Sequence, residues 1–522
     1  MSLIQVTDLS FTYEGSYAPV FEHVSFQIDT DWKLGVTGRN GRGKTTFLKL
    51  LMGELEYTGR ISSSVEFDYF PFPVADKERE TREILEQVIG DTPFWQLDRE
   101  LSKLQVAEDV LYRPFSTLSH GEQTKVLLAA LFLREGHFLL IDEPTNHLDR
   151  EARQLVSRYL NSKKGFILVS HDRAFLDGCV DHILAINRED IEVQKGNFSS
   201  WYENRQRQDA FELGENERLK KDIRRLQSAA RQSRDWADKV EDTKLGWCPK
   251  KAKTFIGTRA YIGEKSRRMQ QRRKNLERRQ EAAIEEKQDL LKNAESVEDL
   301  KLFPLTHHSD RLVVMEQVAA CYGEPLSPVC LAVDLELRRG SRVSFQGRNG
   351  CGKSSLISLI LAAADEGRDG GPRGGSESTL SCTGKLWEAA GMKISYVSQD
   401  TGYLRGSLSQ YARECDVEEQ LFYALLRKLD FSREQFDKPM ETYSEGQKKK
   451  VLIARSLCEQ AHLYIWDEPL NFIDVYSRMQ IEALILKFQP TMILVEHDEA
   501  FTGKVSTEIL EVVRCQDAGQ ND

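Results

Sequence analysis

The stretch GRNGRGKT at residues 38–45 returns as GRNGCGKS at residues 347–354, and this repetition decides the fold. In both copies the glycines permit a tight loop whose backbone N–H groups can point inward at phosphate oxygens. An apolar segment, WKLGVTG, leads into the first copy, and TTFLKLLMG, which is typical of a helix, continues from it. This strand–loop–helix order predicts an α/β nucleotide-binding domain in each half of the chain.

Three further motifs recur in the same order after each loop. LSHGE at 118–122 is matched by YSEGQ at 443–447, FLLIDEPTNHLD at 138–149 by LYIWDEPLNFID at 463–474, and ILVSHD at 167–172 by ILVEHD at 493–498. The continuously apolar strands that carry the last two motifs are typical of buried parallel strands. Four motifs duplicated in order indicate a tandem repeat. We therefore expect two similar domains, a first half at 1–202 and a second half at 301–522.

Residues 203–300, between the halves, have a different pattern. Apolar or small residues alternate at intervals of four and three along 219–240, and others recur every seven residues along 262–290. Heptad spacing of this kind is typical of paired helices. The sequence predicts a long antiparallel α-helical hairpin linker with a tip loop at about 244–262.

Charge is concentrated in this linker. The whole chain has a formal net charge of −10, yet residues 218–280 contain 21 Lys or Arg against 7 Asp or Glu. Such a basic block on an acidic body indicates a projection that meets a polyanion. A solvated helix face is the alternative interpretation.

Composition excludes several classes of protein. No run approaches the roughly 20 apolar residues that span a bilayer, and the N-terminus has no basic region followed by an apolar core. The nine cysteines are scattered and never form a CxxC pair. These features predict a cytoplasmic protein with no membrane partner and no disulfide framework.

The two loops supply phosphate ligands. A lysine after the glycines can neutralise the β- and γ-phosphates of ATP, and the hydroxyl residue that follows can ligate Mg²⁺. The expected nucleotide ligands are Gly38, Asn40, Gly41, Gly43, Lys44, Thr45 and Thr46 in the first loop, and Gly347, Asn349, Gly350, Gly352, Lys353, Ser354 and Ser355 in the second.

Acidic residues and a histidine at strand ends supply the remaining chemistry. An aspartate can hold Mg²⁺ through water, and the glutamate after it can polarise an attacking water. The predicted metal ligands are Thr45, Asp142, Ser354 and Asp467, and the predicted catalytic residues are Glu143, Glu468, His171 and His497, with the histidines contacting the γ-phosphate.

Together these motifs resemble those of the ATP-binding cassette ATPases, in which LSHGE and YSEGQ are similar to the signature motif. The resemblance implies a monomer whose two halves sandwich two ATP molecules head to tail. The first site would pair the first loop with the signature residues Ser444, Glu445, Gly446 and Gln447, and the second site would pair the second loop with Ser119, His120, Gly121 and Glu122. Tyr13 and Tyr322, each 25 residues before its loop, resemble the aromatics that stack on adenine, although either could be an ordinary strand residue.

The whole arrangement resembles the ABC-F class of ribosome-associated factors. DEPTNHLD and the GNFSSW element at 196–201 carry this match, and EPLNFIDVYSRMQIE with VEHDEAF is similar to the Lsa-type antibiotic-resistance proteins. The resemblance implies binding to the tRNA exit site of the 70S ribosome. It further implies a linker that contacts 23S rRNA and P-site tRNA near the peptidyl-transferase centre. Protection against lincosamide, pleuromutilin and streptogramin A antibiotics would follow.

Other functions remain open at this stage. A housekeeping ABC-F factor acting on stalled ribosomes would carry the same motifs. A transporter subunit or a DNA-maintenance ATPase belongs to a different class. The absence of a membrane segment, of zinc modules and of a far longer coiled coil counts against both. We therefore expect no DNA partner.

Some positions depart from the family pattern. The glutamine usual between loop and signature is Gln399 in the second half, where we expect a metal ligand, but Phe72 stands in its place in the first half. Glu445 occupies a signature position where glycine is usual, and Glu496 replaces the serine seen as Ser170. These differences predict two unequal ATP sites.

The linker tip is the last candidate site. Exposed aromatics at a loop tip can stack on nucleobases, and basic residues can neutralise phosphates. A small local core is the alternative role for the aromatics. The RNA- or drug-site candidates are Trp247, Lys250, Lys251, Lys253, Phe255, Arg259 and Tyr261.

Overall fold

The computed structural model describes most of both halves and little of the linker. The described residues are 2–14, 19–90, 92–134, 136–146, 148–187, 191–208, 210–211, 214, 218, 221–225, 228, 300–322, 327–366, 380–431 and 433–515. Within 203–300 all of these residues are helical except Leu300. The predicted tip loop and all seven tip candidates lie outside the described residues, so the hairpin and its tip remain predictions.

The chain divides into two compact units. One unit is Met1–Trp201 together with Val297–Asp522, and the other is Tyr202–Ser296. Both halves therefore belong to one unit, and the predicted linker falls almost entirely in the other.

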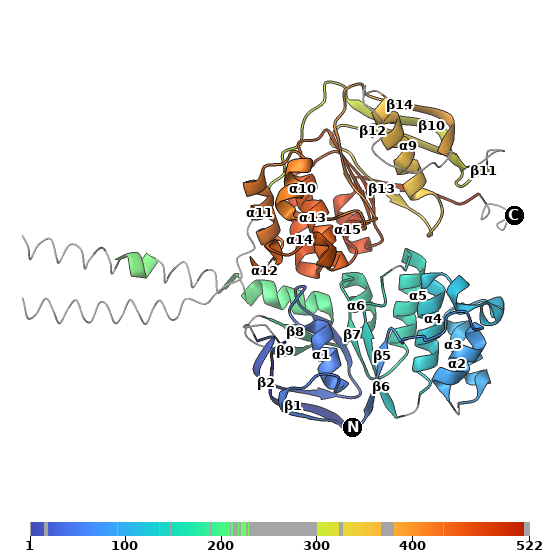
Figure 1. The fold of residues 1–522 in the computed structure, drawn as a ribbon, viewed down its shortest axis with the longest axis vertical. Coiled ribbons are helices and arrows are strands. Elements are labelled where there is room, and N and C mark those ends of the chain that lie inside the picture. Colours follow the sequence, from blue (N-terminus) through green and yellow to red (C-terminus); the bar gives the residue numbers. More distant parts are fainter. Residues whose placement is uncertain are drawn as a thin grey trace, which may run out of the picture. The chain divides into compact units, whose positions relative to one another are not determined.

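The first half contains two sheets and six labelled helices among its described residues, and residues 198–208 form a further helical stretch that begins in this half (Figure 1). Its strands are β1 (Leu3–Phe11), β2 (Phe21–Asp29), β3 (Lys33–Thr37), β4 (Thr58–Ser62), β5 (Glu66–Phe70), β6 (His137–Asp142), β7 (Phe166–Val169), β8 (His182–Ile186) and β9 (Ile191–Lys195). Its helices are α1 (Lys44–Leu51), α2 (Thr81–Ile89), α3 (Phe94–Lys103), α4 (His120–Leu131), α5 (Arg150–Asn161) and α6 (Arg173–Cys179), with 3₁₀ turns at Glu108–Tyr112 and Phe115–Thr117. The main sheet has the order β5-β6-β7-β3-β8-β9, and a smaller antiparallel sheet has the order β2-β1-β4.

The second half repeats this plan. Its strands are β10 (Arg311–Tyr322), β11 (Ser327–Pro328), β12 (Val333–Arg338), β13 (Arg342–Gln346), β14 (Leu380–Glu388), β15 (Ile394–Val397), β16 (Leu463–Asp467), β17 (Met492–Val495) and β18 (Glu508–Glu511). Its helices are α9 (Lys353–Glu366), α10 (Leu408–Glu414), α11 (Glu419–Lys428), α12 (Arg433–Phe436), α13 (Glu445–Cys458), α14 (Val475–Phe488) and α15 (Glu499–Val505), with a 3₁₀ turn at Met440–Thr442. The parallel order β15-β16-β17-β13-β18 reproduces β5-β6-β7-β3-β8 of the first half.

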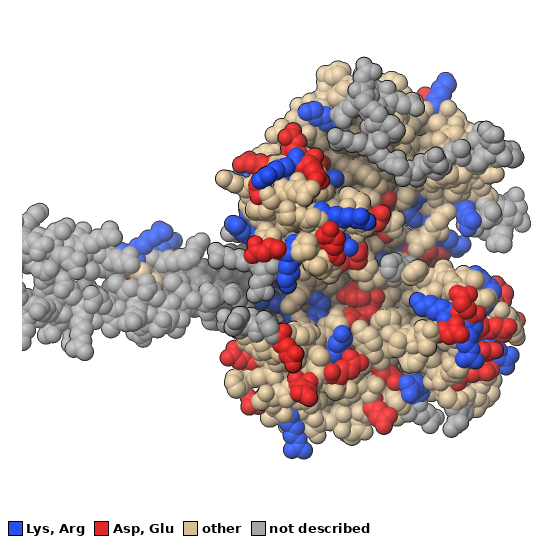
Figure 2. Space-filling view, in the orientation of Figure 1, with Lys and Arg blue, Asp and Glu red and all other residues tan. Residues whose placement is uncertain are grey.

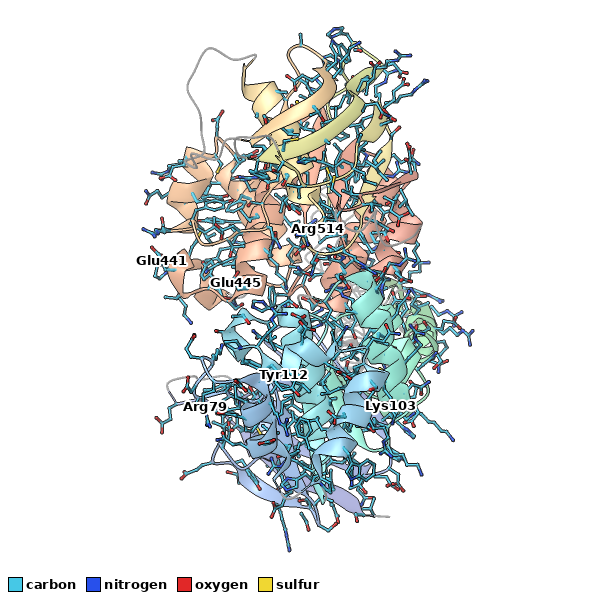
Figure 3. All side chains as sticks on the ribbon, turned by 90° about the vertical axis from the view of Figure 1, so that its right-hand side faces the viewer. Arg79, Lys103, Tyr112, Glu441, Glu445 and Arg514 are labelled. Carbon is cyan, nitrogen blue, oxygen red and sulfur yellow. The ribbon has the colours of Figure 1, made fainter. Side chains whose placement is uncertain are left out.

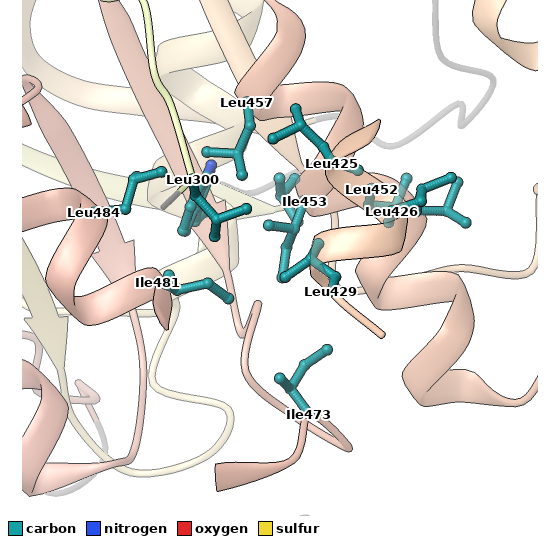
Figure 4. Close-up of a cluster of buried hydrophobic side chains, with 14 of the residues drawn as sticks. Leu300, Leu425, Leu426, Leu429, Leu452, Ile453, Leu457, Ile473, Ile481 and Leu484 are labelled. Carbon is teal, nitrogen blue, oxygen red and sulfur yellow. The ribbon is translucent and has the colours of Figure 1, made fainter. Parts of the chain in front are cut away.

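The central parallel strands are buried, as their apolar runs predict. Every residue of β7 and of β17 is buried, and both strands pair in parallel with their neighbours on each side. In the second half a cluster of buried side chains from α11, α13 and α14 packs together with Leu300, the residue directly before that half (Figure 4). These cores fix the sheet edges at which the strands end in acidic residues.

The described surface mixes both signs of charge. Figure 2 shows Lys and Arg interspersed with Asp and Glu over the face in view. Among the described helices, none is both long enough and apolar enough to cross a membrane.

Candidate functional site

Each glycine loop leads into the N-terminus of a helix, and a lysine side chain folds back over the loop. Gly43, directly before α1, has a φ of 89°, a left-handed conformation that glycine adopts without strain. The ammonium of Lys44 donates to the carbonyl of Gly38 at 2.8 Å, and that of Lys353 donates to Gly347 at 2.8 Å. Both lysines therefore lie over loops whose N–H groups begin a helix, the arrangement that binds phosphate.

The hydroxyl residues of the loops lie against the aspartates that end β6 and β16. Thr45 Oγ1 donates to Asp142 Oδ2 at 2.8 Å, and the Tyr69 hydroxyl donates to the same oxygen at 3.0 Å. Burial raises the pKa of both aspartates. Hydrogen bonds, including one from Ser354 to Asp467, act in the opposite direction and lower it. Within the described part of the chain, Asp467 Oδ1 is buried with no hydrogen-bond partner. Hard oxygen ligands of this kind fit Mg²⁺.

The glutamates after these aspartates have a strained backbone. Glu143 and Glu468 have φ values of 51° and 48°, which non-glycine residues rarely adopt outside sites where the strain serves a purpose. Each glutamate lies beside the histidine of its own half. His171 Nε2 is 3.2 Å from Glu143 Oε1, and His497 Nε2 is 3.6 Å from Glu468 Oε1.

The two glutamates differ in their amide neighbours. Glu468 Oε2 accepts from Gln399 Nε2 at 2.9 Å and from Asn471 Nδ2 at 2.7 Å. The strand register, in which Phe70 faces Ile141 and Val397 faces Trp466, puts Phe72 at the place of Gln399. The first half therefore has no side-chain donor at that position.

Their ionisation differs as well. Burial, followed by the charge of Asp142, raises the pKa of Glu143 to about 8. Burial also acts to raise the pKa of Glu468, but hydrogen bonding and charge from His497 outweigh it and hold that pKa below its ordinary value. Of the two, only the Glu468 carboxylate is fully ionised at neutral pH.

The signature serines are helix caps. Ser119 caps α4 and Ser444 caps α13, each in a capping box with the residue three positions later. The side chains of Glu122 and Gln447, which the family pattern assigns to nucleotide, reach back to the backbone N–H groups of these serines at 2.8 and 2.9 Å. Glu445, labelled in Figure 3, is the first residue of α13.

A cleft of about 860 Å³ unites the second loop with the first signature. Its volume suits a small-molecule ligand. Its lining includes Ser119, Gly121, Glu122, Asn349, Gly350, Gly352, Lys353, Ser354, Ser355, Gln399, Glu468 and His497. These are residues that the sequence assigned to the second site, and the structure brings them together.

The first loop lies against the second signature. Asn40 Nδ2 donates to the carbonyl of Phe472 at 2.8 Å. A Cβ on Gly446 would lie 2.5 Å from that carbonyl and 3.2 Å from the Asn40 amide, so only glycine fits there. The structure thus brings Asn40 of the first loop and Gly446 of the second signature together, as expected for the first site.

The two tyrosines expected at adenine have matching positions. Tyr13 hydrogen-bonds Thr46 through its hydroxyl at 2.8 Å, and Tyr322 hydrogen-bonds Ser355 at 3.0 Å. The two residues are 45% and 36% exposed. Each ring is therefore held at an accessible place beside its loop.

Sequence reasoning missed several groups at these sites. Asn471 was not singled out, although an asparagine recurs in DEPTN and DEPLN. Tyr69 carries no motif signal. Lys450 and Asp474 form a buried ion pair at 2.9 Å. The charge of Asp474 acts to raise the pKa of Lys44, and the charge of Lys450 acts to lower it. The capping boxes were readable from Ser-x-x-Glu and Ser-x-x-Gln.

Two glycine loops, two acidic strand ends with glutamate–histidine pairs and two opposed signature caps define a tandem P-loop ATPase. The family model described as "ABC transporter" matches residues 21–146 and 330–471, just over half of the chain. The protein belongs to this family of ATP-binding cassette proteins and is an ATPase whose two cassettes bind ATP.

Relatives of the whole chain are ABC-F proteins, which confirms that resemblance. The chain is 26% identical to the ribosome protection protein VmlR of Bacillus subtilis strain 168, over 97% of this chain and 86% of that protein. It is 25% identical to the probable ATP-binding protein YbiT of Escherichia coli O157:H7, over 95% and 93%.

Solved structures confirm the fold class. The archaeal ribosome recycling factor aABCE1, crystallised with the stalk protein aP1, gives a TM-score of 0.60 at 18% identity, covering 98% of this chain and 90% of that one. The structure titled RNase-L Inhibitor gives 0.55 at 20% identity, covering 98% and 91%.

Proposed function

We propose that this protein is an ABC-F ATPase that binds the ribosome and protects it from antibiotics. The observation that carries the ATPase part is the cleft in which the second loop, the first signature and Glu468 meet. The ribosomal part is supported by similarity over 97% of the chain to a protein named for ribosome protection. The basic excess of residues 218–280 suits an RNA partner.

At each site we assign the roles that the sequence predicted. Lys44 and Lys353 neutralise phosphates, and Tyr13 and Tyr322 stack on adenine. Mg²⁺ would be held by the loop hydroxyls, Asp142, Asp467 and Gln399, and when bound it would offset phosphate charge. The orphaned Asp467 oxygen fits that role.

The chain's own residues then carry out hydrolysis. In the second site Glu468 accepts a proton from the attacking water, while Gln399 and Asn471 fix the orientation of its carboxylate. His497 holds the carboxylate charged from the other side. Glu143 and His171 are the corresponding pair in the first site.

In this proposal, the linker is the part of the protein that acts on the ribosome. The cytoplasmic monomer would bind the tRNA exit site, and the hairpin would reach along 23S rRNA and P-site tRNA toward the peptidyl-transferase centre. The drug classes expected are lincosamides, pleuromutilins and streptogramin A compounds. The tip candidates at about 244–262 would contact RNA or displace drug, whereas a housekeeping factor would lack the resistance effect.

A trapped variant tests the ribosomal proposal. The double variant Glu143→Gln/Glu468→Gln keeps the shape of the sites but removes both bases, so it should bind ATP and stay on ribosomes. We expect it to sediment with 70S particles in ATP and to be released by RNase treatment. Minimum inhibitory concentrations for the three drug classes, with and without wild-type protein, test protection. Sedimentation without resistance would favour the housekeeping function, and no sedimentation would refute both.

A further inference from the structure

Helices α5 and α14 occupy equivalent places in the two halves, as do α6 and α15. Each of the four begins directly after a capping aspartate; these are Asp149, Asp474, Asp172 and Asp498. Counting from the caps makes Arg173 the counterpart of Glu499 and Ser157 the counterpart of Glu482. The residues at these equivalent positions differ in charge between the halves.

A buried ion pair joins the halves at one of these positions. Arg173 Nη2 of the first half lies 2.6 Å from Glu482 Oε2 of the second half, and the two side chains are only 9% and 10% exposed. Lys504 of the second half contacts the other oxygen of Glu482 at 2.8 Å. Removing one partner from a buried pair leaves an uncompensated charge, which is strongly destabilising.

At the equivalent position on the other side of the interface between the halves, the contacts are different. Ser157 stands there in place of the acid, and a cavity of about 300 Å³ lies between it and Glu499. Glu499 Oε1 instead lies 2.5 Å from Arg150 Nε and accepts from Gln154 Nε2 at 2.5 Å. The counterparts of Arg150 and Gln154 in the second half are Val475 and Met479, neither of which donates a side-chain hydrogen bond.

We propose that these charges select pairing between a first half and a second half and reject pairing between two like halves. Between two second halves, Glu499 would take the place of Arg173 and face Glu482, carboxylate against carboxylate. Between two first halves, Arg173 would face Arg150. Like charges at such contacts suppress wrong partners. The tether within one chain then favours the intramolecular pair.

This inference rests on the proposed ATP sandwich but not on the ribosomal role, because its tests need neither ribosomes nor drugs. Full-length Arg173→Glu and Glu482→Arg should each lower steady-state ATPase at least tenfold. The double exchange, made together with Lys504→Glu so that no cation faces the arginine introduced at position 482, restores the pair with reversed polarity and should return activity to within threefold of wild type. Lys385→Glu, an exposed charge reversal on β14, is the matched control and should leave the rate unchanged. Single variants equal to this control, or a combined variant no better than the weaker single, would overturn the proposal.

A second test covers the case in which buried reversals prevent folding. Glu499→Arg concerns a side chain that is 36% exposed, so folding should survive. This variant makes two second halves complementary, because the introduced guanidinium of one chain would face Glu482 of another, while Arg150 would repel the intramolecular contact. We expect light scattering with ATP to give twice the monomer mass, whereas wild type and Lys385→Glu stay monomeric. A monomeric Glu499→Arg would contradict the proposed selection.

Discussion

Replacing Glu468 by glutamine should remove most of the ATP turnover, whereas Glu143→Gln should remove little of it. The Glu468 carboxylate is oriented by amide donors from Gln399 at 2.9 Å and Asn471 at 2.7 Å. In the first half Phe72 occupies the place of Gln399, as the strand register requires. A poorly oriented base abstracts a proton less often, because general-base catalysis depends on hydrogen-bond geometry.

The magnitude follows from the ionisation of the two groups. Burial and then the charge of Asp142 raise the pKa of Glu143 to about 8, from an ordinary value of 4.5. A base works only in its deprotonated form, so at pH 7 about one-tenth of Glu143 is active. Glu468, whose pKa lies below its ordinary value, is fully active there. If the sites are otherwise equal, Glu468→Gln leaves about one-tenth of the activity and Glu143→Gln about nine-tenths.

Steady-state phosphate release at pH 7 and pH 9 measures both points. Because the pKa of Glu143 is raised, its active form gains as pH rises through about 8. The residual activity of Glu468→Gln should therefore increase about tenfold between the two pH values, while that of Glu143→Gln changes little. Glu316→Gln, at an exposed position on β10, controls for the loss of a carboxylate. Equal losses at pH 7, or a flat profile for Glu468→Gln, would refute the reasoning.

Three further expectations concern the linker and the core. Deleting 247–256 should abolish resistance in growth assays but leave ATPase and ribosome sedimentation intact, and retained resistance would show that the tip is only a turn. Reversing charges on the basic return of the linker should weaken sedimentation and make it fall less steeply with rising salt than in wild type, since each lost phosphate contact removes its counterion release, and an unchanged salt dependence would contradict this role. The positions to reverse are Arg267, Arg268, Arg272 and Arg273. Leu452→Ala, at a fully buried side chain of α13, should lower the free energy of unfolding by about 2–5 kcal/mol in denaturant titrations, whereas a loss below about 1 kcal/mol would indicate a site that collapses around the gap.

The sequence predicted those parts of the fold that depend on local chemistry. A glycine loop between an apolar strand and a helix occurs at Lys44 and again at Lys353, and the structure has β3–α1 and β13–α9 there. The apolar runs before Asp142 and Asp467 predicted buried strands, and these are β6 and β16. Each signal lies within a dozen residues, which is why one sequence was enough.

Contacts between segments that are far apart in the sequence could not be predicted. The orientation of Glu468 depends on Gln399, which is 69 residues away, and the Asn40 amide meets a carbonyl 432 residues away. Neither contact follows from a motif, because both contacts depend on how the strands pair and how the halves meet. The inequality of the sites was nevertheless predictable, since Phe72 shows in the sequence itself.

The inequality of the sites and the charge exchange at the interface share one physical origin. In a symmetric homodimer every contact residue appears on both sides, so a base that is well oriented in one site is well oriented in both. Fusing two copies in one chain removes that constraint. The second half can then keep Gln399 while the first half has Phe72, and Arg173 can meet Glu482 without facing its own copy. Charges that enforce unlike pairing also ensure that every closed molecule contains one site of each kind. With a fast site and a slow site in every molecule, ATP turnover would be separate from prolonged closure of the two halves on ATP. The steady-state activities of the single variants Glu143→Gln and Glu468→Gln measure directly how turnover is divided between the sites.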